Sequence, residues 1–174
     1  MLELMKSKII GKGKKIAFPE GDDIRILKAA VRLYNEKVAN PILLGNKEVI
    51  NNLARDNNLD INGMEIVDPV NDSRFEEYAN KMVEIRKGKN SLEDCKKMLT
   101  GRNYYAVMML EVGECDAVLG GATYSTADTV RPALQIIKTK PTSKIVSSCF
   151  YMNKEGKEHD QSRDQYMISH VNSA

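Results

Sequence analysis

The sequence has no tryptophan, two histidines and three cysteines among its 174 residues. The cysteines, Cys95, Cys115 and Cys149, are odd in number, and none stands in a CxxC pair. This pattern argues against a disulfide framework and against a zinc site, and it favours a reducing compartment. The histidines, His159 and His170, have no cysteine close to them, which disfavours a histidine-based metal site. We therefore expect a cytoplasmic protein without a metal.

Long apolar runs and an excess of one charge are also missing. No segment reaches the roughly 18 consecutive apolar residues of a membrane-spanning helix. The N-terminal stretch MLELMKSKIIGKGKK lacks the long apolar core of a signal peptide. The 26 basic and 24 acidic residues give a net charge of +2 and are spread along the chain, without the basic stripe that nucleic-acid binding needs. We expect no membrane partner and no nucleic-acid partner.

What the sequence does contain is an alternation of short apolar segments and stretches of helical periodicity. Strands are predicted at 14–21, 40–46, 64–69, 115–122 and 144–152, and helices at 22–37, 47–59, 72–89, 91–101 and 103–114. Strands separated by helices of this length imply crossover connections and a largely parallel sheet. We predict an α/β three-layer sandwich, in which helices cover both faces of a mostly parallel sheet.

The densest group of polar side chains lies in GGATYSTADTVRPALQIIKTKP (120–141), directly after the predicted strand 115–122. In parallel α/β sheets, ligands bind just beyond the carboxyl ends of the strands. This stretch is therefore placed for binding. It contains no GxxxxGK[ST] phosphate loop and no GxGxxG dinucleotide fingerprint, which disfavours a sugar-nucleotide or NAD enzyme.

The residues of this stretch suit an anion. Gly120 and Gly121 allow positive φ and close backbone approach, so the loop can expose its N–H groups. Ser125 or Thr126 can cap a helix, whose first-turn N–H groups and dipole favour a bound anion. Arg131 adds a planar guanidinium that suits phosphate or carboxylate. The alternative is that Ser125 is only a cap and that Arg131 pairs with a surface carboxylate.

The proline at position 132 affects where the next helix begins. A proline inside a helix removes a hydrogen bond and kinks the helix, whereas a proline at the first position fits well. We therefore predict a short turn at 125–130 followed by a helix from Pro132, with Leu134 and Ile137 facing inward.

The stretch at 120–141 resembles the signature of phosphate acetyltransferases, which share a broader group with phosphate butyryltransferases. The likeness extends through YAVMMLEVGECDAVLGGA, YANKMVEIRKGK, ANPILLGN and KKIAFPEGDDIRILKAA, over roughly residues 1 to 150. It implies reversible transfer of an acetyl group between acetyl-CoA and phosphate, giving acetyl phosphate and CoA. It also implies a homodimer whose substrate is acetyl-CoA and which has no tightly bound cofactor. The motif STADTVRPALQIIKT is more similar to the acetyl than to the butyryl branch.

The resemblance also implies site residues. Arg131, in TVRPALQ, matches the signature arginine and would bind the phosphate or acyl-phosphate group. Arg86, in EIRKGK, matches a second arginine that lines the same cleft, although a cation at a helix C-terminus is also favourable by itself. The loop residues implied as phosphate ligands are Gly120, Gly121, Ser125 and Thr126.

The last stretch, NKEGKEHDQSRDQYMISHVNSA (153–174), is polar and lacks a sustained apolar period. We expect a first domain at 1–152 that resembles phosphate acetyltransferase, followed by an atypical, flexible tail at 153–174. The resemblance places further catalytic groups in a later part that this chain lacks, so we expect weak or absent transfer by this truncated chain alone and a tendency to associate. The alternatives are a non-catalytic anion-binding or oligomerising remnant, and an acyltransferase similar to phosphate butyryltransferase.

Overall fold

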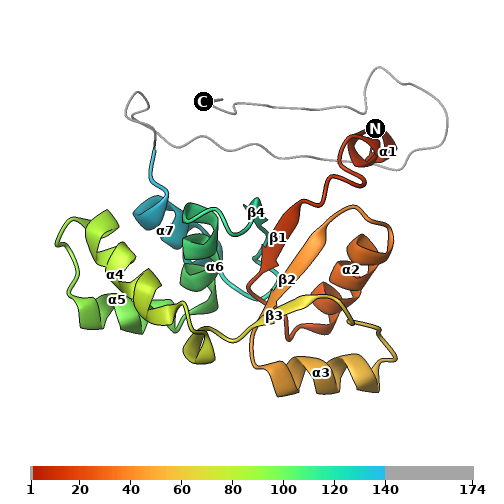
Figure 1. Ribbon diagram of the computed structural model, residues 1–174, viewed down its shortest axis with the longest axis horizontal. Helices are drawn as coiled ribbons and strands as arrows, with labels where there is room; N and C mark the ends of the chain where they lie inside the picture. Colours follow the sequence, from red (N-terminus) through yellow and green to blue (C-terminus); the bar gives the residue numbers. More distant parts are fainter. Residues whose placement is uncertain (1, 140–174) are drawn as a thin grey trace. The chain divides into compact units, whose positions relative to one another are not determined.

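Four parallel strands form the centre of the protein, in a computed structural model that describes residues 2–139 (Figure 1). The strands are β1 (Lys15–Phe18), β2 (Asn40–Leu44), β3 (Glu65–Val67) and β4 (Ala117–Val118), and they lie in the order β3-β2-β1-β4. Residues Met1–Ile137 make up one compact unit. The predicted strand at 144–152 and the predicted boundary at residue 152 lie outside the described residues.

The helices follow the strands in the predicted alternation. They are α1 (Leu2–Ser7), α2 (Ile24–Asn35), α3 (Lys47–Asp56), α4 (Phe75–Arg86), α5 (Leu92–Leu99), α6 (Arg102–Glu111) and α7 (Thr126–Ile136), and the 3-10 turn η1 (Pro69–Asn71) precedes α4. Polar side chains set several of the helix starts. Asp23 caps α2, Asn46 caps α3, and Ser91 forms a capping box with Asp94 at α5.

Two hydrophobic cores lie on the two faces of the sheet. Successive strand residues point to opposite faces. In β2, Leu43 therefore packs with α2 and α3, whereas Ile42 and Leu44 pack with residues of α4 to α7. The view in Figure 1 shows α2 and α3 on one side of the sheet and α4 to α7 on the other. The predicted α/β fold, with a parallel sheet covered on both faces, is confirmed.

The prediction for the start of α7 is wrong. The helix begins at Thr126 and continues through Pro132, which lies inside it. Because proline has no N–H, the carbonyl oxygen of Asp128, four residues earlier, has no helical donor. The side-chain Nδ2 of Asn103, on α6, donates to that oxygen at 3.2 Å. A neighbouring helix thus supplies a hydrogen bond for a carbonyl that the proline leaves unpaired.

The inward face of α7 also differs from the prediction. Pro132 and Ile136, one helical turn apart, are buried, and Ile136 is 2% exposed. Leu134 and Ile137 were expected to face inward, but they are 46% and 40% exposed. The buried side of α7 contains Pro132 and, four residues later, Ile136. Leu134 and Ile137 therefore lie on another side of the helix.

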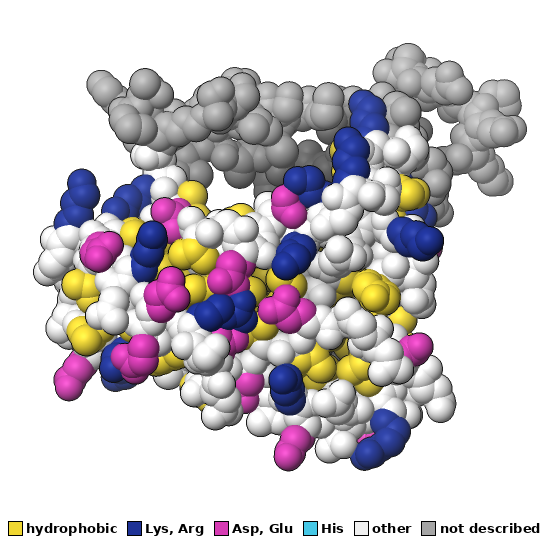
Figure 2. Space-filling view, viewed as in Figure 1, with side chains coloured by type: hydrophobic (Ala, Val, Ile, Leu, Met, Phe, Trp, Pro, Cys, Tyr) yellow, Lys and Arg dark blue, Asp and Glu magenta, His cyan; other side chains and the backbone are white. Residues whose placement is uncertain are grey.

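The surface mixes charges of both signs. On the face shown in Figure 2, Lys and Arg side chains lie among Asp and Glu side chains. Ion pairs such as Arg74–Asp72 at 2.6 Å and Lys96–Glu76 at 2.7 Å join some of them. No helix in the described part of the chain is long and apolar enough to cross a membrane.

Candidate functional site

The candidate site begins where β1 and β4 end. These strands pair in parallel, with Ala17 opposite Val118, so the loops that follow them meet at the same edge of the sheet. The N–H of Leu119 still donates to the carbonyl of Ala17 at 2.9 Å, and beyond it the chain leaves the sheet. The strand is therefore shorter than the predicted 115–122, because the following residues turn around a side chain from the loop after β1.

That side chain is Glu20, which is 3% exposed. Its Oε2 accepts hydrogen bonds from the N–H groups of Gly121 at 2.8 Å and Ala122 at 3.0 Å. Its Oε1 accepts from the N–H and the hydroxyl of Thr123, the latter at 2.7 Å, and from the N–H of Tyr124 at 3.1 Å. One buried carboxylate thus receives five hydrogen bonds from a loop about a hundred positions away in the sequence.

These contacts determine the charge of Glu20. Burial raises the pKa of the carboxyl, but the hydrogen bonds from the Thr123 hydroxyl and from three consecutive N–H groups outweigh it and lower the pKa to about 2. The carboxylate is therefore ionised at neutral pH. Our reading of the sequence missed Glu20, although a carboxylate directly after a strand that ends at this edge was a usable signal.

The backbone conformation of the loop around Glu20 uses a glycine. Gly121 has a φ of +106°, a conformation that side chains disfavour, as the glycine pair suggested. Its N–H, which we expected to face a ligand, donates to Glu20. The phosphate-binding roles of Gly120 and Gly121 stay predictions.

Ser125 is the N-cap of α7. Its Oγ accepts from the N–H of Asp128 at 3.1 Å and lies 2.7 Å from the Asp128 carboxylate, to which it donates. The predicted capping role is therefore confirmed. Thr126 is the first residue of α7 and is exposed.

The two arginines of the predicted site differ in their contacts. Arg131, on α7, is exposed and forms no ion pair with any residue within 2–139. Arg86, the last residue of α4, donates from Nε to the side chain of Asn90 at 2.8 Å and from Nη1 to the carbonyl of Gln135 at 3.2 Å. A surface carboxylate paired with Arg131, the alternative raised by the sequence, is not present among these residues.

Tyr104, on α6, lies close to both arginines. Its hydroxyl donates to the side chain of Gln135 at 2.9 Å. Burial raises the pKa of Tyr104, and the nearby positive charges of Arg131 and Arg86 oppose this shift. Arg86 and Tyr104 therefore both contact Gln135, which lies one helical turn after Arg131 on α7. That the two arginines line one cleft stays a prediction.

Two further arginines at this edge are already paired. Arg102 contacts Asp22 at 2.5 Å, and Arg25 contacts Asp23 at 2.7 Å while donating to the carbonyl of Ala122 at 3.3 Å. The charges of Arg102 and Arg25 are therefore offset within the chain, unlike that of Arg131. Among the side chains that the structure describes, no group of three or more His, Cys, Asp or Glu residues could hold a metal ion.

Comparison with known proteins identifies the family. The family model described as "Phosphate acetyl/butaryl transferase" matches residues 1–168. The chain belongs to this family. The match runs past residue 152 and includes part of the segment that we expected to depart from the family.

Individual family members show how much of the fold is shared. A phosphate acetyltransferase from Staphylococcus aureus (strain MRSA252) is 40% identical over 159 residues, which are 91% of this chain and 48% of that protein. The structure of a phosphotransacetylase from Streptococcus pyogenes aligns with a TM-score of 0.84 and 45% identity, over 88% of this chain and 47% of that one. The EutD phosphotransacetylase from Staphylococcus aureus aligns with a TM-score of 0.81 and 42% identity, with the same coverage. The chain spans about half the length of the curated relatives it matches.

Proposed function

We propose that this chain takes part in the reversible transfer of an acetyl group between acetyl-CoA and phosphate, and that Arg131 and Arg86 bind the phosphate or acetyl phosphate. The observation that carries the proposal is that Arg86 donates to the carbonyl of Gln135, one helical turn after Arg131 on α7, and that neither arginine forms an ion pair within the described residues. Membership of the phosphate acetyl/butaryl transferase family supports the reaction class.

The chemistry needs positive charge at this place. In the proposed reaction the thiolate of CoA attacks the acetyl carbonyl, the bond between the acyl carbon and the phosphate oxygen breaks, and phosphate leaves with the electron pair. Negative charge therefore grows on the leaving oxygen, where fixed guanidinium groups stabilise it. Holding both substrates in one orientation supplies a further large part of the rate.

Several finer assignments belong to the same proposal. Ser125 and Thr126 are proposed as further phosphate ligands, and Gly120 and Gly121 as parts of the phosphate loop. Acetyl-CoA is proposed as a substrate rather than a bound cofactor, the active form as a homodimer, and the location as cytoplasmic. The family name supports the substrates, and the remaining assignments rest on the resemblance of the sequence.

Binding is tested by titrating the full chain with acetyl phosphate and following 31P NMR line widths. Arg131→Ala should weaken the binding at least tenfold, because it removes the exposed guanidinium. Arg55→Ala is the matched control, since it removes an exposed arginine from α3, and it should change the affinity by less than twofold. Equal binding by the unaltered chain and Arg131→Ala would refute the site.

Turnover is measured separately, as CoA-dependent loss of acetyl phosphate. Transfer that depends on Arg131 supports the full proposal. Binding without any transfer would show that the chain is an anion-binding protein of this family rather than a transferase by itself. Repeating the titration with butyryl phosphate distinguishes an acetyl from a butyryl preference.

A further inference from the structure

Four consecutive N–H groups, from Gly121 to Tyr124, converge on one point of the candidate site. Backbone N–H groups arranged in this way form a concave anion site, and in many proteins a phosphate or another ligand anion fills it. Here the occupant is the carboxylate of Glu20, and the Thr123 hydroxyl adds a fifth donor at 2.7 Å. The chain itself therefore provides the anion.

The contact between Glu20 and the loop lies where it can affect the position of Arg131. Glu20 follows β1, whereas the loop follows β4 and leads directly into Ser125, the N-cap of α7. Arg131 lies further along the same helix. The side chain of Arg25 also contacts the loop, by donating to the carbonyl of Ala122 at 3.3 Å. Glu20 and Arg25 thus both hold the loop just before the helix that carries Arg131.

We propose that Glu20 is a positioning residue, which holds the loop at 120–125 so that α7 presents Arg131. The inference rests on the proposed function and deepens it. Because the N–H groups of residues 121–124 already donate to Glu20, Gly120 and Gly121 contribute to the phosphate loop through its shape, and the positive charge for phosphate comes from Arg131 and Arg86.

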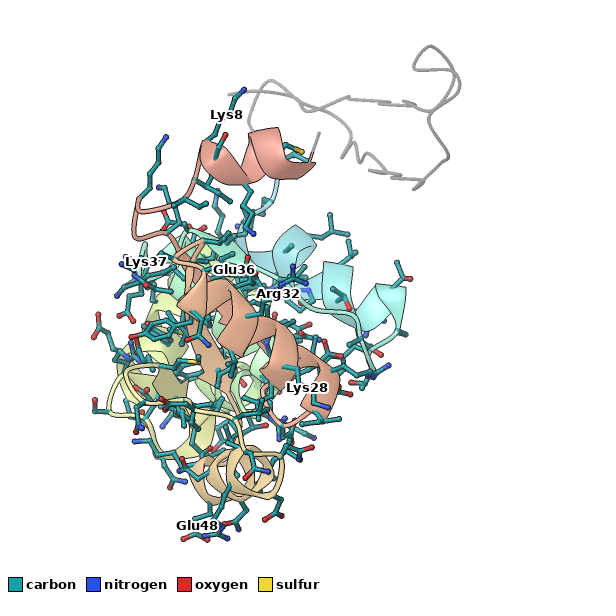
Figure 3. All side chains as sticks on the ribbon, turned by 90° about the vertical axis from the view of Figure 1, so that its right-hand side faces the viewer. Lys8, Lys28, Arg32, Glu36, Lys37 and Glu48 are labelled. Atoms are coloured by element: carbon teal, nitrogen blue, oxygen red, sulfur yellow. The ribbon has the colours of Figure 1, made fainter. Side chains whose placement is uncertain are left out.

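The first arm of the test follows the loop without any ligand. Amide hydrogen exchange of residues 121–124 is measured by NMR in the full chain and in Glu20→Gln, which keeps the shape and removes the charge. Exchange at these four amides should speed up at least tenfold. Glu48→Gln is the matched control, because Glu48 is exposed and lies on α3, away from α7 in the views of Figures 1 and 3. It should leave these four amides unchanged.

The second arm measures affinity for acetyl phosphate. Glu20→Gln should weaken binding at least tenfold, although the substituted side chain is not expected to touch the ligand. In Glu20→Ala, added formate should refill the backbone site, slow the exchange of residues 121–124 and restore most of the affinity. A residue needed only for folding would not give this rescue.

The two proposals can fail separately. If the unaltered chain does not bind acetyl phosphate, the proposed function is wrong, and the exchange arm still decides whether Glu20 holds the loop. Unchanged exchange in Glu20→Gln would overturn the positioning role, and so would full affinity in a variant whose loop exchanges fast. If Glu20→Gln does not fold, Thr123→Val is used instead, because it removes one of the five hydrogen bonds. This variant should speed amide exchange at residues 121–124 about threefold. No change in exchange there would equally overturn the positioning role of Glu20.

Discussion

The loop at 120–125 and the helix α7 that follows it differ in how the charged group at each of them is paired. In the loop, the buried carboxylate of Glu20 is matched by five hydrogen bonds. On α7, Arg131 is exposed and has no carboxylate partner within the described residues. A rigid, internally satisfied scaffold next to an unpaired charge is typical of a binding loop. Substitutions in the first region should therefore cost stability as well as ligand affinity, whereas substitutions of Arg131 should cost ligand affinity alone.

The largest effect on stability should come from acid. Glu20 has a pKa of about 2 in the folded protein, against an ordinary value of 4.5. Because the folded pKa is the lower one, Glu20 stabilises the fold above about pH 4.5, and this contribution is lost as the pH falls toward 2. The shift corresponds to roughly 3 kcal/mol in the free energy of unfolding. Urea denaturation between pH 7 and pH 2 measures the loss.

Glu20→Gln serves as the control for this acid effect. It should reduce the dependence on pH by about the same 3 kcal/mol, because the titrating group is gone. Asp72, whose pKa the hydrogen bond from Arg74 lowers to about 2, will still contribute to the remaining slope. An identical pH profile for both proteins would contradict the assigned state of Glu20.

A smaller effect is expected at the cap of α7, which joins the two regions. Ser125→Ala should lower the free energy of unfolding by about 1 kcal/mol, since it removes an N-cap. Ser91→Ala is matched to it, because Ser91 caps α5 with the same spacing to an aspartate. Both should cost similar stability, but Ser125→Ala alone should weaken acetyl phosphate binding, by threefold or more. Equal affinity in both variants would leave Ser125 as a cap without a ligand role.

The smallest effect on stability is expected at Arg131. Arg131→Ala should change the free energy of unfolding by less than about 0.5 kcal/mol, because the side chain is exposed and has no ion pair among the described residues. The loss of ligand affinity predicted above should therefore occur in a fully stable protein. A large loss of stability would show that Arg131 is part of the scaffold, and it would remove the contrast between the two regions.

Much of the fold could be predicted because it depends on local patterns. Strands buried on both faces have nearly continuous apolar sequences, as in the segment NPILL of β2, and such segments are easy to locate. The capping box of Ser91 and Asp94 is likewise encoded within four residues. Arg131 was singled out by its place in the polar stretch after a predicted strand, whereas Arg86 was found through the resemblance of the sequence.

What could not be predicted depends on partners far away in the sequence. Pro132 is a local argument for a helix start, but Asn103 provides the compensating hydrogen bond, and nothing near Pro132 reveals it. The burial of Glu20 likewise requires a loop about a hundred positions later to close around it. Tertiary contacts override local preference at both places.

Asn103 donates a hydrogen bond to the carbonyl of Asp128, which Pro132 leaves without a helical donor. The residue needed at position 103 therefore depends on the residue at position 132. A relative that carries alanine or lysine at position 132 restores the backbone donor and no longer needs an amide at position 103. A relative that keeps the proline at position 132 but has no amide side chain at position 103 leaves the carbonyl of residue 128 without this hydrogen-bond donor. We expect the two positions to change together during evolution, because one hydrogen bond between α6 and α7 depends on both.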